Sequence, residues 1–221
     1  MAEISKNFIS LVALGRPNPQ ILNVDFLKAN KILPADEPPF DKLFQQEKPF
    51  TSFVSTPVMS DLELENIQFI VEVSRFQIRD SAVSDWTKTK ILDIARKYFE
   101  VLPHTPLTVV GINLNVMITF ITPEESVNFQ QIFLPENSKV LEIISKNNIA
   151  ADLVLRYPYY DNKARIALTL NQPIKAKHKR AVNFNYEFDF TNWSDFATEL
   201  GKIPEIGKYF DSIVSRLLKG C

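Results

Sequence analysis

Few side chains in this chain are of the types that carry out nucleophilic, acid–base or metal chemistry. Its 221 residues include two histidines, His104 and His178, and one cysteine, Cys221. Zinc centres use three or four His, Cys or carboxylate ligands at short spacings, and neither histidine has a second one at helical or hairpin spacing. The sequence has no Gly-x-Ser-x-Gly, P-loop or Gly-x-Gly-x-x-Gly segment. We therefore expect neither a metal nor another cofactor.

His104 is the candidate for general acid–base catalysis, because histidine titrates near neutral pH. It lies in Pro103-His104-Thr105-Pro106, between a predicted helix and a predicted strand. A hydrolase-like enzyme would need a carboxylate brought to His104 by folding. We favour a structural corner instead, in which Pro103 stops the helix and the His104 or Thr105 side chain binds the freed backbone groups.

Three acids, Asp61, Glu63 and Glu65, alternate with Leu62 and Leu64. Carboxylate oxygens are the ligands that hard cations prefer. However, alternation with period two places the three acids on one face of a strand, where acids usually face solvent. We therefore interpret them as a solvated strand edge.

One basic cluster stands out, formed by Lys175, Lys177, His178, Lys179 and Arg180. It precedes the aromatic segment Ala181–Phe190, so phosphate contacts beside base stacking are one hypothesis. Because those aromatic residues share the face predicted to be core, we favour a solvated loop or an edge strand guarded by lysines. The net charge of -1 provides no overall field that would attract a nucleic acid.

The composition is that of a globular protein with a sizeable core. Hydrophobic residues make up 45% of the chain and charged residues 23%. Seventeen Phe against five Gly indicates a core built on aromatic packing. A single cysteine excludes an intrachain disulfide and favours the reducing cytoplasm. No stretch approaches about twenty apolar residues, so no membrane span is expected.

The β pattern is clearest in three stretches. Leu107–Ile121 is almost uncharged and rich in β-branched residues, and we expect it to be the longest strand. Ala181–Phe190 alternates apolar and polar residues almost strictly. Ile67–Arg79 is predicted as a second long strand, with a bulge near Ser74 where the alternation changes phase.

Helices are predicted between and after these strands. Ser84 has the character of an N-cap for a helix over Asp85–Val101, and Thr122-Pro123-Glu124-Glu125 is a typical helix start. Further helices are predicted over 139–145, 192–200 and 205–218. The predicted fold is α+β, with an antiparallel sheet of about seven strands and long helices packed on one face. We expect one domain over 1–221, with two similar halves, 1–103 and 104–221, each a β-meander with a helix.

Four short segments carry a resemblance. Asn18-Pro19, Arg75-Phe76-Gln77-Ile78, His104-Thr105-Pro106 and Gly111-Ile112-Asn113 resemble the corresponding segments of a loose group of uncharacterised prokaryotic proteins. The resemblance spans roughly residues 7 to 120 and implies no activity. It singles out Arg75, His104, Thr105 and Asn113 as candidate binding residues.

These observations leave three hypotheses for function. The first is a non-enzymatic binding or assembly protein that forms a homo-oligomer, because a Phe-rich sheet that is half exposed needs a cover that a second subunit could supply. The second is a hydrolase-like enzyme using His104. The third is nucleic-acid binding through Lys175, Lys177, Lys179 and Arg180.

Overall fold

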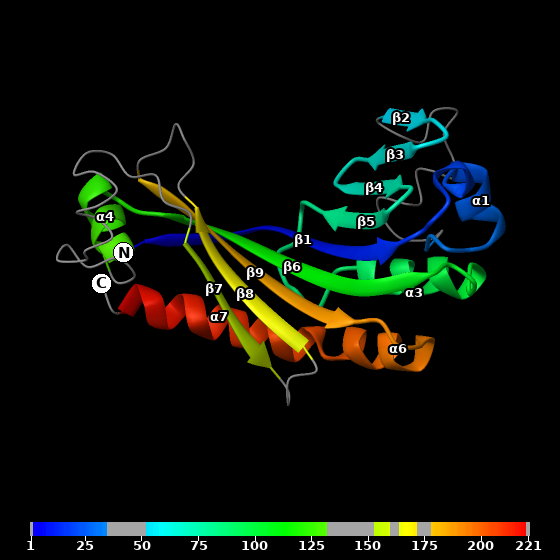
Figure 1. Ribbon diagram of the computed structural model, residues 1–221. Helices are drawn as coiled ribbons and strands as arrows, with labels where there is room; N and C mark the ends of the chain where they lie inside the picture. Colours follow the sequence, from blue (N-terminus) through cyan, green and yellow to red (C-terminus); the bar gives the residue numbers. More distant parts are fainter. Residues whose placement is uncertain (1, 35–51, 132–152, 160–163, 172–177, 220–221) are drawn as a thin grey trace.

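The computed structural model describes residues 2–34, 52–131, 153–159, 164–171 and 178–219 (Figure 1). These residues form one antiparallel sheet with helices, so the predicted α+β class is confirmed. The sheet has nine strands in the described residues, in the order β2-β3-β4-β5-β1-β6-β9-β8-β7. The strands are β1 (Glu3–Gly15), β2 (Ser52–Ser55), β3 (Met59–Leu64), β4 (Ile67–Glu72), β5 (Arg75–Asp80), β6 (Leu107–Thr119), β7 (Leu153–Tyr159), β8 (Ala164–Asn171) and β9 (Lys179–Asp189).

The strand order is similar on the two sides of a central pair. β1 pairs with β6 in this pair, with Leu11 opposite Ile112. On one side β1 is followed by β5, β4, β3 and the additional edge strand β2, and on the other side β6 is followed by β9, β8 and β7. The order agrees with the idea of two similar halves; that residues 1–103 and 104–221 are such halves stays a prediction.

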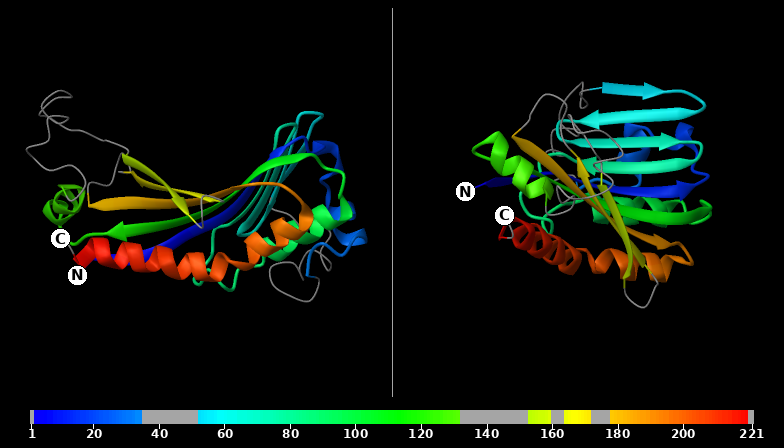
Figure 2. Two further views of the ribbon diagram at one scale, coloured as in Figure 1. Left: turned by 60° about the horizontal axis from the view of Figure 1, so that its bottom comes forward. Right: turned by 60° about the vertical axis from the view of Figure 1, so that its left-hand side comes forward.

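The helices are α1 (Val24–Ala29), α3 (Ile91–Val101), α4 (Pro123–Gln131), α6 (Trp193–Gly201) and α7 (Ile203–Lys219), with a 3-10 turn at Pro19–Ile21. Figure 2 shows α3, α6 and α7 on the same side of the long central strands. Aromatic rings join these layers, because Phe76 of β5 lies 4.7 Å from Tyr98 of α3 and Phe184 of β9 lies 5.1 Å from Phe210 of α7, centroid to centroid. We call this side of the sheet the helix face and the other side the open face.

The core follows from strict alternation in the strands. Every second residue of the central strands is fully buried on the helix face, including Ile9, Leu11, Phe76, Ile78, Ile112, Leu114, Phe184 and Tyr186. Each such side chain contributes about 1.5–3 kcal/mol through burial. The intervening residues project onto the open face, and in β6 and β9 many of them are polar.

One predicted strand is two strands in the structure. The stretch 67–79 reverses direction at Val73-Ser74, so that β4 and β5 pair with each other, with Glu72 opposite Arg75. The prediction of a bulge near Ser74 was wrong. The change of phase marks a turn, which is held by the end of β1 because the Gly15 amide donates to the Ser74 carbonyl at 3.0 Å.

The helix predicted from Asp85 begins later, at Ile91. Asp85 starts a local turn instead, in which its carboxylate accepts hydrogen bonds from the backbone amide and the hydroxyl of Thr87. These two bonds lower the pKa of Asp85. The turn aims Trp86 into the core, where it is 2% exposed. The helix predicted over 139–145 lies outside the described residues.

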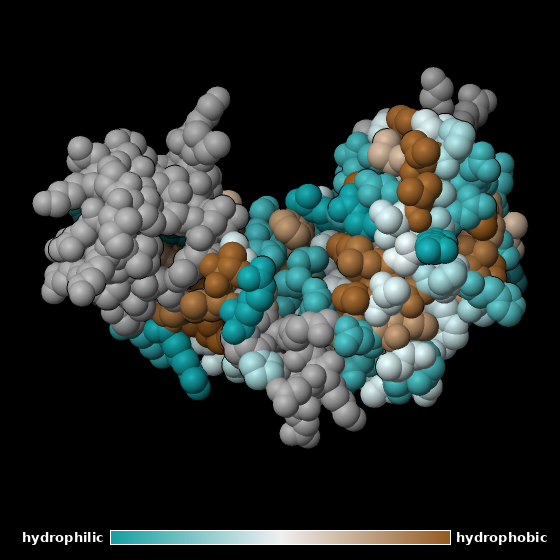
Figure 3. All heavy atoms as spheres, in the orientation of Figure 1, coloured by the Kyte–Doolittle hydropathy of each residue, from teal (hydrophilic) through white to brown (hydrophobic). Residues whose placement is uncertain are grey.

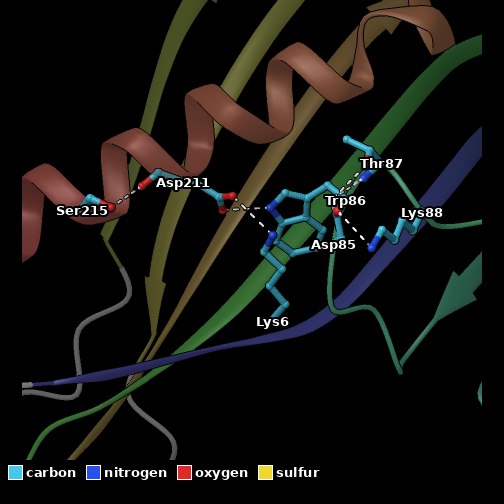
Figure 4. Close-up of polar contacts among 7 residues, drawn as sticks. All are labelled: Lys6, Asp85, Trp86, Thr87, Lys88, Asp211 and Ser215. Atoms are coloured by element: carbon cyan, nitrogen blue, oxygen red, sulfur yellow. Dashed lines mark hydrogen bonds and ion pairs between the residues drawn. The ribbon is translucent and has the colours of Figure 1, made fainter.

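Trp86 is the centre of a cluster that fixes α7 to the sheet, which we call the tryptophan clamp (Figure 4). Its indole Nε1 donates to the Asp211 carboxylate at 2.9 Å, and Lys6 of β1 pairs with that carboxylate at 3.3 Å. The Lys6 ammonium also lies 4.7 Å from the centroid of the indole ring. A Cβ at Gly207 of α7 would come within 2.8 Å of the Trp86 side chain, so a glycine is needed there.

Among the described residues, no helix is long and apolar enough to cross a membrane.

Candidate functional site: a polar row on the open face

A row of polar side chains crosses the open face at the level of the sheet centre. Gln68 of β4, Arg79 of β5, Ser10 of β1, Asn113 of β6 and Asn185 of β9 are successive register partners. Neighbouring strands lie about 4.8 Å apart, so these five residues form one line perpendicular to the strands. We call this line the polar row.

The row exists because β6 and β9 carry asparagines at alternating positions. Asn113 lies opposite Asn185, and Asn115 lies opposite Asn183. Asparagine is depleted in strands, since it packs poorly on a pleated surface and favours turns. Two adjacent Asn–Asn pairs in the middle of a sheet therefore oppose the local conformational preference.

Some of these polar groups are satisfied by one another. The Asn113 Nδ2 donates to the Ser10 hydroxyl at 3.3 Å, and the Asn7 Nδ2 donates to the Asn115 Oδ1 at 3.0 Å. Ser10 is 4% exposed and Asn115 is 7% exposed. The floor of the open face is thus a polar layer that is largely buried by its own neighbours.

Two atoms of the row make no hydrogen bond to the residues that the structure describes. They are the Oδ1 of Asn185 and the Nε of Arg79, and both are buried. The Asn185 amide lies over Gly111, where a Cβ would meet Asn185 Oδ1 at 3.1 Å. A buried polar group without a partner costs about 1–3 kcal/mol, so each such group in a folded protein calls for an explanation.

Arg79 is held in place by an aromatic ring rather than by an acid. Its guanidinium carbon lies 4.1 Å from the centroid of the Phe8 ring. Arg75, on the same strand and the same face, pairs instead with Glu72 at 3.0 Å. No carboxylate forms an ion pair with Arg79 in the described part of the chain. Its positive charge is therefore available to a ligand.

The acids of the neighbouring strand are engaged locally. The Gln68 Nε2 donates to both oxygens of Asp61, at 3.0 and 3.1 Å, and the Ser52 hydroxyl donates to Glu63 at 3.4 Å. Glu65 lies in the following turn with a φ of 46°. Within the described residues, no three His, Cys, Asp or Glu side chains are grouped so that they could hold a metal ion.

The two parts of the sheet are inclined to each other. Figures 1 and 2 show that the β2–β5 part of the sheet stands at a steep angle to the long strands β1, β6 and β9. Figure 3, in the orientation of Figure 1, shows apolar patches separated by polar surface.

The sequence-predicted candidates separate into two groups. Arg75 and Asn113 lie on the open face. His104 and Thr105 lie in the corner between α3 and β6, and the described part of the chain shows no hydrogen bond or ion pair made by either side chain. No hydrogen bond or ion pair joins any two of these four residues.

The corner is organised by backbone contacts. The indole of Trp193 donates to the Pro103 carbonyl at 3.0 Å, and the Arg16 amide donates to the Pro106 carbonyl at 2.9 Å. The Thr105 amide donates to the Leu102 carbonyl at 3.1 Å. His104 itself is exposed. These contacts agree with a structural corner, although the backbone ties come from Trp193 and Arg16 rather than from the His104 or Thr105 side chain.

The basic cluster is only partly described. Lys175 and Lys177 lie outside the described residues, whereas Lys179 and Arg180 begin β9. Arg180 is 4% exposed and lies opposite Ile118, whose side chain belongs to the core. Burial lowers the pKa of the Arg180 guanidinium. Arg180 is therefore not placed to reach a phosphate backbone at the surface.

Of the five residues in the polar row, only Asn113 was a candidate from the sequence; Gln68, Arg79, Ser10 and Asn185 were not predicted, and neither was Phe8, which lies against Arg79. Their signal is the alternation of apolar and polar residues in separate strands, which becomes a row only when the register is known. Neither a family model nor a curated protein matches this chain.

Proposed function

We propose that this chain is a non-enzymatic binding and assembly protein that recognises its partner on the open face of the sheet. The observation that carries the proposal is the polar row, in which Arg79 has no carboxylate partner among the described residues and the Arg79 Nε and Asn185 Oδ1 make no hydrogen bond to the described part of the chain. Unpaired polar groups call for an explanation, and a molecule bound over the row is the one we propose.

The chemistry of the row suits recognition rather than catalysis. Its groups are amides, a hydroxyl and a guanidinium, which keep a fixed protonation state near neutral pH. General acid–base catalysis requires a group whose pKa lies near the working pH. The row can donate and accept hydrogen bonds, but its members do not exchange protons with a substrate.

Self-association is the assembly part of the proposal, and an apolar patch at one end of the sheet supports it. Leu14, Val58 and Val73 are 42%, 63% and 53% exposed. They lie at the ends of neighbouring strands, because Leu14 is opposite Arg75 and Met59 is opposite Glu72. We call these three residues the apolar end patch.

A cytoplasmic location is also proposed, because Cys221 is the single cysteine.

Light scattering coupled to size-exclusion chromatography tests the assembly part. We expect the wild-type protein to form a dimer or larger homo-oligomer whose population rises with concentration. Val73→Asp places a charge in the apolar end patch and should shift the protein toward monomer. The matched control is Thr198→Asp, which places the same charge at an exposed position of α6. Val12→Asp would not serve as a control, because it changes the floor of the open face. Only monomer over a wide concentration range would contradict self-association.

A further inference from the structure

We propose that Arg79, stacked on Phe8, binds a carboxylate of an extended acidic polypeptide segment laid along the polar row. This inference rests on the proposed function, because it assigns the chemistry of the partner that the open face recognises.

The first step of the argument is the state of the Arg79 guanidinium. The Phe8 ring lies 4.1 Å from the guanidinium carbon and restricts where the guanidinium can lie. A planar guanidinium presents parallel N–H donors, which match the two oxygens of a carboxylate. Because no described carboxylate pairs with Arg79, a ligand carboxylate would not have to displace one of these acids.

The second step is the row that continues from Arg79. Ser10, Asn113 and Asn185 extend the line across three more strands. Three strand spacings amount to about 14 Å, which is the length of about four residues of an extended peptide. Peptide groups donate and accept hydrogen bonds as asparagine amides do, and the side chains of Asn113 and Asn185 are half-buried rather than fully covered.

The third step is the charge around the site, which separates a polypeptide from a nucleic acid. Three acids lie on the open face: Asp61 in β3, Glu72 in β4 and Glu187 in β9. A polyanion laid across this face would meet these acids on both sides of Arg79 and be repelled. A segment with one carboxylate among neutral residues avoids them and still reaches Arg79.

The test compares two short capped peptides of serine and threonine that differ in one central residue, Glu or Gln. Binding to the full-length protein is measured by isothermal titration calorimetry at low salt. We expect the Glu peptide to bind about tenfold more tightly than the Gln peptide, the size expected for a charge-assisted pair of hydrogen bonds. Arg79→Gln should abolish this preference, and Arg79→Lys should retain part of it because the charge stays while the planar fork is lost.

Arg96→Gln is the matched control. Arg96 is an arginine on α3 that pairs with Glu100 at 2.9 Å, so its loss changes the net charge equally at a distance from the open face. The preference for the Glu peptide should be unchanged in this variant. Thermal unfolding of each variant establishes that it is folded.

Equal affinity of the folded wild-type protein for the two peptides would overturn the inference. So would tighter binding of a single-stranded oligonucleotide than of the Glu peptide, or a preference that survives Arg79→Gln. Light scattering on the same samples separates the two proposals. A protein that self-associates but ignores the peptides refutes the carboxylate site and leaves the assembly function standing.

Discussion

Two cations in the described part of the chain, Lys6 and Arg79, lie over aromatic rings. On the helix face, Lys6 lies over Trp86 and pairs with Asp211 at 3.3 Å. On the open face, Arg79 lies over Phe8, and no described carboxylate forms an ion pair with it. The two sites are joined through β1, because the register shift between Lys6 and Phe8 sends these residues to opposite faces of the sheet.

The difference separates a structural cluster from a binding surface. In the tryptophan clamp, the indole N–H, the ammonium and the carboxylate satisfy one another, and the result is a fixed contact between α7 and the sheet. In the polar row, an acceptor and a donor stay unpaired although they are buried. A polar cluster whose groups satisfy one another stabilises the fold, whereas we propose that the incomplete polar row binds a ligand.

The largest effect should come from breaking the clamp. Trp86→Ala removes a side chain that is 2% exposed, and we expect the free energy of unfolding to fall by about 3–5 kcal/mol. Trp86→Phe keeps the apolar ring and loses the hydrogen bond to Asp211, so it should cost less. Urea unfolding measures both, and a change below about 1 kcal/mol for Trp86→Ala would show that the clamp does not hold α7.

A buried hydroxyl on the helix face calibrates the cost of an unpaired polar group. Tyr98 is fully buried and its hydroxyl has no hydrogen-bond partner. We expect Tyr98→Phe to raise the free energy of unfolding by about 1 kcal/mol, because it removes a desolvated group and keeps the ring. Thermal or urea unfolding at neutral pH checks this prediction. A lower free energy of unfolding for Tyr98→Phe than for the wild-type protein would mean that the buried hydroxyl does not destabilise the folded state.

The same residue predicts a dependence on pH. Burial raises the pKa of Tyr98 above its ordinary value of 10.0. The folded state therefore keeps the neutral hydroxyl while the unfolded chain ionises, so the contribution of this group is constant below pH 10 and is lost as the pH rises above it. Above pH 10 the wild-type protein should lose stability more steeply than Tyr98→Phe. Parallel slopes for the two proteins would contradict the assignment.

Gly111→Ala tests the polar row by disturbing the position of Asn185. The added Cβ would meet Asn185 Oδ1 at 3.1 Å, and the amide must move by a few tenths of an ångström. We expect a small effect on stability, of about 1 kcal/mol or less, together with weaker peptide binding. Calorimetric titration that gave wild-type affinity would indicate that the position of Asn185 is not important for recognition.

The smallest effects compare the two cations directly. Asp211→Asn removes the charge partner of Lys6. Because the Lys6 and Asp211 side chains are 22% and 45% exposed, we expect the free energy of unfolding to fall by only about 0.5–1 kcal/mol. Arg79→Gln breaks no ion pair and should change stability by no more than about 0.5 kcal/mol. If Arg79→Gln proved the more destabilising of the two in urea unfolding, Arg79 would be a structural residue.

Much of the fold could be predicted from local patterns. The alternation in Ala181–Phe190 and the apolar run from Leu107 correspond to β9 and β6, and Thr122-Pro123 starts α4 as the capping residues indicate. The reversal at Val73-Ser74 was missed because Val73 is typical of strands and Ser74 is a weaker turn former than Gly, Pro, Asn or Asp, none of which stands beside it. The late start of α3 was missed because Asp85 caps a turn as readily as a helix.

The site could be predicted only in part, for a reason of geometry. Asn113 was a candidate because of a resemblance, and Arg75, also a candidate, lies on the open face outside the row. A row across five strands depends on a register that no single strand encodes. Arg79 resembles Arg75 in the sequence, and the two differ only in that Glu72 lies beside Arg75 after the chain turns. The interpretation of His104 as part of a structural corner rested only on the two flanking prolines, because the end of a helix at a proline is a local feature of the sequence.

The most direct test of the central claim is a map of the ligand-contacting groups by NMR. The side-chain signals of Arg79 Nε–H and of the Asn113 and Asn185 amides are followed while the Glu peptide is added to the wild-type protein. We predict that these signals shift and that the Trp86 indole signal does not. Shifts confined to the helix face or to the apolar end patch, with the three polar-row signals unmoved, would contradict the claim that the open face is the binding surface.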